Sequence, residues 1–177
     1  MPQEQRHTLA VLVENRPGVL TRIAGMFARR GYNIHSLAVG PTDDPFVSRL
    51  TIVVGSDAVQ LEQIIKQLNK LVHVLKILEL DPAESVEREL QLVKVTAPPD
   101  VRSEVIELVD VFRAKIVDVD HESVTIEAAG AAEKLEALVA LLEPYGIREL
   151  VRSGTISLSR GTRSITDGSR LRSLRAG

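Results

Sequence analysis

Residues 15–20, Asn-Arg-Pro-Gly-Val-Leu, combine features that suit the binding of a small anion at the start of a helix. Proline is preferred at the first helical position and disfavours the helical region for the residue before it. We therefore expect Arg16 to be the N-cap and Asn15 to lie just outside the helix. Gly18 lacks a side chain, so a ligand carboxylate could approach the free N–H groups at the positive helix end. An ordinary helix start, with Asn15 organising a turn, is the alternative. The residues that would line such a site are Asn15, Gly18, Val19 and Leu20.

Two further polar positions could contact a ligand. Asn33 follows Arg29-Arg30-Gly31-Tyr32 at the beginning of an expected strand, where its amide could bind an ammonium or carboxylate group. A turn residue with unusual backbone angles is the alternative. Asp43 and Asp44 precede Pro45 in an expected loop; the two carboxylates could bind a cation, but a solvated turn explains them more simply.

Patterns typical of catalytic and metal sites are absent from the sequence. The chain has no cysteine, which excludes disulfides, thiolate metal sites and cysteine nucleophiles. It contains no G-x-S-x-G elbow, phosphate-binding loop or dinucleotide fingerprint. We therefore expect no catalytic residue and no metal site. The four histidines lack paired metal-ligand spacing: His7, His35, His73 and His121.

Composition limits the class of protein. The 177 residues are 44% hydrophobic and 26% charged, which predicts a soluble globular chain of one ordinary domain or two small ones. A formal charge of -2 provides no general basic field, so binding to nucleic acid or to a membrane surface is disfavoured. No apolar stretch approaches the ~18 residues of a membrane span, and the lack of cysteine suits a reducing compartment. We expect a cytoplasmic protein.

Hydrophobic periodicity predicts the elements that position the candidate residues. The apolar run 8–13 is typical of a buried strand. Leu20, Ile23, Ala24 and Phe27 repeat at i, i+3, i+4 and i+7, which predicts a helix that ends at Gly31. The same reasoning predicts strands at 33–40, 46–54 and 72–80, and a helix that begins at Asp57 with Gln60 in a capping box.

The order strand, helix, strand, strand, helix, strand then recurs. Strands are expected at 90–96, 115–119 and 124–128, with a last strand or strands within 147–158. Two helices are expected, one bearing Val105, Leu108, Val109 and Phe112 and one marked by Leu135, Leu138, Val139 and Leu142. We therefore predict an α+β protein of two ferredoxin-like βαββαβ sandwiches in tandem. The expected boundaries are a first domain at 7–80, a linker at 81–89, a second domain at 90–160 and a flexible, arginine-rich tail at 161–177.

The first predicted sheet is apolar on both faces. Val72, Val74, Leu78 and Leu80 alternate with Leu75 and Ile77, so neither side of that strand is polar. Helices cover only one face of a ferredoxin-like sheet, which means that something else must cover the other. We expect the second half or another chain to do so, most simply in a two-fold dimer.

The sequence resembles the small regulatory subunit of acetolactate synthase, also called acetohydroxyacid synthase (AHAS), with its amino-acid-binding ACT domain. The resemblance lies in N-x-P-G-V-L, then R-x-x-x-F-x-x-R-G-Y-N-I and P-T-D-D-P. It continues through QLNKLVHVLKILEL, RELQLVKV, FRAKIVDV and RSGTISLSRG, and so covers about residues 7–161. The tail beyond residue 165 matches no pattern of the family.

The resemblance implies a noncatalytic homodimer that stimulates a large catalytic subunit. It also implies feedback inhibition by a branched-chain amino acid, typically valine, bound between the ACT domains at 7–80 of two chains. The expected effector residues are Asn15, Gly18, Val19 and Leu20 of one chain with Asn33 and Ile34 of the other. No cofactor is expected in this chain, whereas the catalytic partner is expected to use thiamine diphosphate, Mg²⁺ and FAD.

Other functions are possible for this order of elements. An RNA-recognition module is disfavoured because residues 47–52 carry neither exposed aromatics nor a basic consensus. A small acyl phosphate hydrolase would need a phosphate-binding loop that residues 15–18 only weakly approximate. A freestanding tandem amino-acid sensor that regulates transcription or another biosynthetic enzyme is the main alternative, and a pull-down of the partner would distinguish it.

Overall fold

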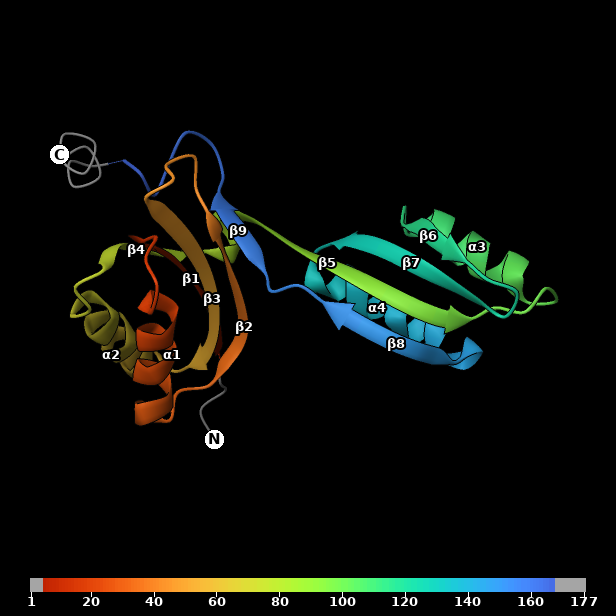
Figure 1. The fold of residues 1–177 in the computed structure, drawn as a ribbon, viewed down its shortest axis with the longest axis horizontal. Helices are drawn as coiled ribbons and strands as arrows, with labels where there is room; N and C mark the ends of the chain where they lie inside the picture. Colours follow the sequence, from red (N-terminus) through yellow and green to blue (C-terminus); the bar gives the residue numbers. More distant parts are fainter. Residues whose placement is uncertain (1–4, 168–177) are drawn as a thin grey trace. The chain divides into compact units, whose positions relative to one another are not determined.

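The computed structural model describes residues 5–167, which form two compact units (Figure 1). The first unit contains the described residues up to Val86 together with those from Thr155 onward, and the second contains Glu87–Gly154. The chain therefore leaves the first unit, forms the second and returns to the first. This differs from the expected boundary, which assigned residues up to 160 to the second domain.

The first unit has the predicted βαββαβ order. Its four strands form one antiparallel sheet in the order β2-β3-β1-β4. The two helices lie on one face of that sheet (Figure 1), which confirms the ferredoxin-like fold. The elements are β1 (Gln5–Glu14), α1 (Val19–Arg30), β2 (Ile34–Pro41), β3 (Val47–Ser56), α2 (Ala58–Asn69) and β4 (Val74–Leu80).

The buried face of α1 is not the expected one. Leu20 is 42% exposed and Ala24 is exposed, so the predicted stripe that includes them is wrong at two of four positions. The helix instead buries a stripe that includes Val19 and Met26, because these larger side chains remove more apolar area from water than an alanine does. The buried residues of α1 are Val19, Ile23, Met26 and Phe27.

Helix α1 ends as predicted at a glycine. Gly31 has φ 68°, and its N–H donates to the carbonyl of Ala28 at 3.2 Å. The Tyr32 N–H donates to the carbonyl of Phe27 at 3.1 Å, which completes a Schellman motif. The rings of Phe27 and Tyr32 meet edge to face with centroids 6.4 Å apart, so an apolar contact supports this helix end.

Helix α2 begins with a side-chain cap. The Asp57 carboxylate accepts a hydrogen bond from the Gln60 N–H at 2.8 Å, as the predicted N-terminus requires. Asp57→Ala should therefore lower the free energy of unfolding by about 1 kcal/mol. Urea denaturation of the whole chain measures this loss, with Gln63→Ala on the exposed side of the same helix as the control. Equal effects of the two substitutions would contradict a stabilising cap.

The second unit repeats the same topology. Its sheet has the order β6-β7-β5-β8, and α3 and α4 pack against one face of it. Arg102 fixes the start of α3, since its guanidinium donates to the carbonyls of Ala97, Asp120 and His121 at 2.6–3.0 Å. The elements are β5 (Ser85–Thr96), α3 (Arg102–Val111), β6 (Lys115–Val119), β7 (Ser123–Gly130), α4 (Ala132–Leu142) and β8 (Ile147–Arg152).

The expected linker at 81–89 is largely regular structure. Asp81 caps a short 3-10 turn, η1 (Pro82–Glu84), by accepting from the Ala83 N–H at 2.9 Å, and β5 then begins at Ser85. Strand β9 (Ile156–Ser159) pairs with β5, and the Arg160 N–H donates to the Glu84 carbonyl at 2.7 Å. The backbone partners supplied by this returning segment explain why the connector is ordered.

The returning segment also covers the open face of the first sheet. Ile165 is only 4% exposed and lies in a second core with Ala10, Leu12, Val47 and Leu80. The sequence predicted that something must cover this apolar face, and among the described residues the chain's own returning segment packs on it. The expected flexible tail at 161–177 is therefore incorrect for residues 161–167, and its remaining residues, 168–177, lie outside the described part.

Candidate functional site

A tight turn that contains Pro17 and Gly18 precedes helix α1, so the proline is not the first helical residue. The Val19 N–H donates to the Arg16 carbonyl at 3.4 Å, and Gly18 between them has φ 83° and ψ -8°. With Pro17 at the second position, these values are typical of a type II turn, whose third position favours glycine. The N-cap is therefore Gly18 and not Arg16, because the turn must be completed before the first helical residue.

The N-terminus of α1 has no side-chain cap. The Arg22 N–H donates to the Gly18 carbonyl at 3.1 Å as the first helical bond, and the amides of Leu20 and Thr21 have no acceptor among residues 5–167. No acidic residue lies in the first turn, whereas α2 is capped by Asp57. A Cβ placed on Gly18 would meet nothing within 4 Å. The positive end of α1 is thus open to an anion.

Asn15 is hydrogen-bonded to the loop beside this helix end through two of its N–H groups. Its Nδ2 donates to the Pro45 carbonyl at 2.9 Å, and its backbone N–H donates to the Phe46 carbonyl at 2.8 Å. The side-chain oxygen receives no hydrogen bond from the described residues and can accept one from a ligand ammonium group. Both interpretations of Asn15 therefore apply: the NH₂ group organises the loop, and the carbonyl remains available.

The nearest carboxylate is already paired. Glu14 Oε2 lies 3.1 Å from Arg16 Nε and 3.0 Å from His73 Nδ1. The side chain of Glu14 is about three-quarters buried, so these contacts are partly shielded from water. Because its charge is balanced by Arg16, Glu14 opposes a ligand carboxylate at the helix end less than an unpaired acid would.

Exposed apolar side chains lie near the same helix end. Leu20 is on α1 itself, and Phe46, which is 74% exposed, follows the carbonyl that Asn15 holds. Val39 pairs with Leu50 in the register of β2 and β3, so it lies on the helix-bearing face. Neither Val39 nor Phe46 is among the effector residues predicted from the sequence. Phe46 is brought to the helix end by the hydrogen bond from Asn15 to the Pro45 carbonyl. This bond joins residues 30 positions apart, so no local sequence signal indicates it.

The six predicted effector residues form two groups within one chain. Asn15, Gly18, Val19 and Leu20 lie at the start of α1, whereas Asn33 and Ile34 follow its end. The 12 residues of α1 separate the two groups by roughly 17 Å at 1.5 Å per residue. The two groups therefore do not meet within one chain, as the expectation that Asn33 and Ile34 act from the facing chain already implied. Strand β2, which Ile34 begins, lies at one edge of its sheet, and such an edge can pair with another chain.

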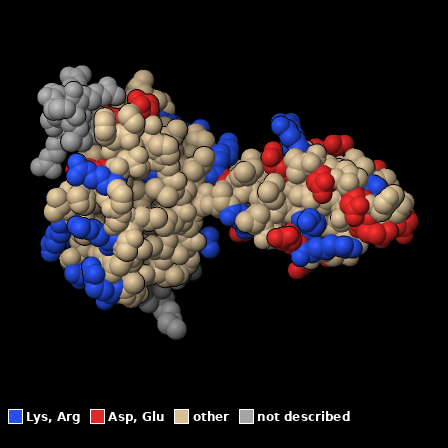
Figure 2. All heavy atoms as spheres, in the orientation of Figure 1, with Lys and Arg blue, Asp and Glu red and all other residues tan. Residues whose placement is uncertain are grey.

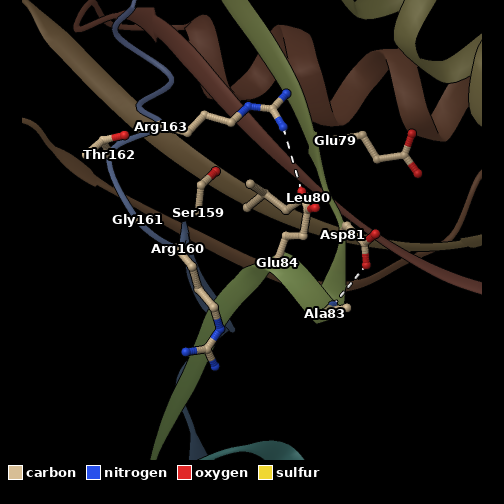
Figure 3. A pocket seen from close by; sticks show the side chains of 10 residues that line it. All are labelled: Glu79, Leu80, Asp81, Ala83, Glu84, Ser159, Arg160, Gly161, Thr162 and Arg163. Carbon is tan, nitrogen blue, oxygen red and sulfur yellow. Dashed lines mark hydrogen bonds and ion pairs between the residues drawn. The ribbon is translucent and has the colours of Figure 1, made fainter.

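A separate hollow of about 520 Å³ lies between the end of β4 and the returning segment (Figure 3). Its charged groups are partly paired with each other, since Arg163 Nη1 lies 4.0 Å from Glu84 Oε2. Figure 3 shows Arg160 pointing away from this pair. Both signs of charge line this hollow together with the apolar side chains of Leu80 and Ala83, and none of the predicted effector residues belongs to it. Its lining residues are 79–81, 83–84 and 159–163.

The two units differ in the charge that they carry. Figure 2 shows Lys and Arg side chains gathered over α1 and α2, where a positive potential favours an anionic ligand. The second unit, residues 87–154, instead has eight Lys and Arg against fourteen Asp and Glu. The basic residues over the first two helices are Arg22, Arg29, Arg30, Lys66 and Lys70.

Neither a metal-ligand cluster nor a membrane-spanning helix is found within residues 5–167. No group of three or more His, Cys, Asp or Glu side chains in this part is arranged to hold a metal ion. Among the described helices, none combines the length and the apolar character needed to cross a membrane.

Comparisons with known proteins match both units. Residues 9–76 match the family described as the AHAS small subunit-like ACT domain, and residues 88–161 match that of the small subunit of acetolactate synthase. The acetolactate synthase small subunit of Mycolicibacterium smegmatis is 58% identical over 159 residues, covering 90% of this chain and 94% of the relative. A probable acetolactate synthase small subunit of Archaeoglobus fulgidus is 52% identical over 158 residues, covering 89% and 99%. The crystal structure of the acetolactate synthase small subunit from Thermotoga maritima has a TM-score of 0.84 at 42% identity, covering 90% and 99%.

Proposed function

Because this chain belongs to the family of acetolactate synthase small subunits, we propose that it stimulates a large catalytic subunit and confers feedback inhibition by a branched-chain amino acid, most simply valine. The observation that carries the effector site is the uncapped N-terminus of α1, with free amides at Leu20 and Thr21. In this proposal thiamine diphosphate, Mg²⁺ and FAD bind the large subunit, and this chain holds none of them.

The chemistry of valine fits the groups around this helix end. Its carboxylate would accept hydrogen bonds from the amides at the start of α1, where the helix dipole also favours a negative charge. The free Oδ1 of Asn15 would accept from its ammonium group. Leu20 and Phe46, both exposed, would cover the isopropyl group and lose contact with water when they do so.

The division of the predicted residues between two helix ends supports a dimer as the binding unit. Asn33 and Ile34 of a second copy would complete the site from across the edge of β2. A ligand that contacts both copies favours one arrangement of the dimer over another. Inhibition follows if that arrangement stimulates the large subunit less, and a coupling free energy of roughly 1 to 3 kcal/mol is enough for a usable response.

Asn15→Ala should make the reconstituted enzyme resistant to valine. The substitution removes the acceptor for the ammonium group and releases the loop at Pro45, so we expect the valine concentration for half-inhibition to rise about tenfold or more. Stimulation of the large subunit should persist, because the substitution loosens only the exposed loop at Pro45 and removes no side chain from the core. The measurement is acetolactate formation by the two purified subunits over a series of valine concentrations.

Asn69→Ala provides the matched control. Asn69 is also exposed, and its Nδ2 also donates to a backbone carbonyl, that of Ile65 at 3.0 Å, but it lies at the end of α2. This variant should keep normal inhibition. Unchanged inhibition in Asn15→Ala would reject the site, and failure of the wild-type chain to bind or stimulate a large subunit would favour a freestanding amino-acid sensor.

A further inference from the structure

Strand β2 contains an irregularity next to the residues proposed to contact the effector. Ile34 pairs with Val54 of β3 and Ser36 pairs with Val53, so His35 is an extra residue between them. Such a β-bulge bends the strand and changes the direction of neighbouring side chains, and bulges are common beside functional sites. The bulge therefore separates the proposed effector contacts, Asn33 and Ile34, from the rest of β2.

Immediately after the bulge, β2 is bonded to the returning segment. The hydroxyl of Ser36 accepts a hydrogen bond from the Thr155 N–H at 2.7 Å. Thr155 is 7% exposed, and it is the first residue after Gly154, with which the second unit ends. A single residue, His35, thus lies between Ile34, which is a proposed effector contact, and Ser36, which is hydrogen-bonded to Thr155.

A second hydrogen bond holds the same segment against the neighbouring strand. Arg49 of β3 donates from Nη2 to the carbonyl of Ser157 at 2.6 Å. Burial lowers the pKa of the Arg49 guanidinium from its usual value, and Ser157 is 3% exposed. A charge-assisted hydrogen bond that is partly shielded from water is stronger than an exposed one. Residues 155–157 are thus held by two adjacent strands of the first unit.

We propose that the hydrogen bond between Ser36 and Thr155 couples effector binding at β2 to the junction with the second unit. The inference rests on the proposed function and deepens it by naming the residue through which the site acts. A ligand that contacts Ile34 of β2 favours one arrangement of the bulge, and Ser36 carries that preference to Thr155. Because the hydrogen bond from Arg49 holds Ser157 in place, the conformational change is concentrated at Thr155. Ser36 is a positioning residue and does not touch the ligand.

Ser36→Ala separates binding from response. The variant should bind valine with a Kd within about threefold of the wild-type value, measured by isothermal titration calorimetry on the whole chain. In the reconstituted enzyme, the maximal inhibition at saturating valine should fall by at least half, while stimulation without valine is retained. Ser36→Thr keeps the hydroxyl and suits a strand position, so it should restore the inhibition.

Ser164→Ala is the matched control, because the Ser164 hydroxyl also accepts from a backbone amide, that of Thr166 at 3.1 Å, away from the junction. It should leave inhibition unchanged. Full inhibition of Ser36→Ala with normal valine binding would overturn the coupling role, and so would a loss of binding, which would place Ser36 in the effector site. If wild-type protein binds none of valine, leucine and isoleucine, the proposed function itself fails.

A second readout follows the amide directly. Hydrogen exchange at Thr155 should change by at least threefold when valine is added to the wild-type dimer, and it should not respond to valine in Ser36→Ala. Exchange that is equally sensitive to valine in both proteins would also overturn the inference. A merely structural role for Ser36 would alter the exchange rate without altering its response to the effector.

Discussion

Gly18→Asp should abolish the response to valine while the protein still folds and stimulates the large subunit. The new carboxylate would lie in the open space beside Gly18, next to the free amides at the start of α1, and would compete for them with the carboxylate of the effector. It would also repel the carboxylate of the effector. The expected loss is about two orders of magnitude in valine affinity, or roughly 3 kcal/mol. Isothermal titration with valine measures it, and the inhibition curve of the reconstituted enzyme provides a second readout.

Gly18→Asn separates the effect of charge from that of backbone strain. Gly18 has φ 83°, a conformation that costs most residues about 1–2 kcal/mol, and asparagine and aspartate are among those that tolerate it best. Both substitutions therefore introduce similar strain, but only aspartate introduces a negative charge. We expect the asparagine variant to bind valine more tightly than the aspartate variant by at least tenfold. Equal, wild-type affinity of both variants would show that the effector does not use this helix end.

Ile165→Ala should lower the free energy of unfolding by about 2–5 kcal/mol, which is the usual range for truncating a buried isoleucine to alanine. Ile165 is 4% exposed and lies against Ala10, Leu12 and Leu80 on the face of the sheet that no helix covers. Its truncation leaves a cavity in that core and weakens the attachment of the returning segment. Urea denaturation monitored by circular dichroism measures the loss.

The control for this prediction is Ile156→Ala in the same segment. Ile156 is 60% exposed, so its truncation should change the free energy of unfolding by no more than about 0.5 kcal/mol. A loss of less than 1 kcal/mol for Ile165→Ala would mean that residues 161–167 do not contribute to the core of the first unit. A large loss for both variants would indicate that the whole segment, and not Ile165 in particular, stabilises the sheet.

Features that depend on neighbours in sequence were predicted well. Gly31 ends α1 because the helix must close its last carbonyls within a few residues, and Asp57 caps α2 because its side chain reaches an amide three positions away. The alternation of short apolar runs and helical stripes produced the βαββαβ order of both units. These signals act within one turn of helix or a few residues of strand, so they can be found without tertiary information.

The first residue of α1 could not be predicted from its neighbours in the sequence. Proline and glycine at 17 and 18 are compatible with a helix that begins at Pro17 and with a type II turn that precedes Val19. The structure contains the turn, which makes Gly18 the N-cap and faces Val19 and not Leu20 into the core. A shift of one residue rotates a helix by about 100°, so the choice was settled by which stripe buries more apolar surface.

By itself, the sequence determined the class of fold, the duplicated topology and the resemblance to a family. Only the tertiary structure decided that residues 155–167 return to the first unit, that Ile165 packs on Ala10, and that Ser36 holds the junction at Thr155. The hydrogen bond between Ser36 and Thr155 alone joins residues 119 positions apart. Such contacts leave no periodic pattern in the sequence, because the partner of a buried side chain is selected by packing in the folded chain and not by its neighbours.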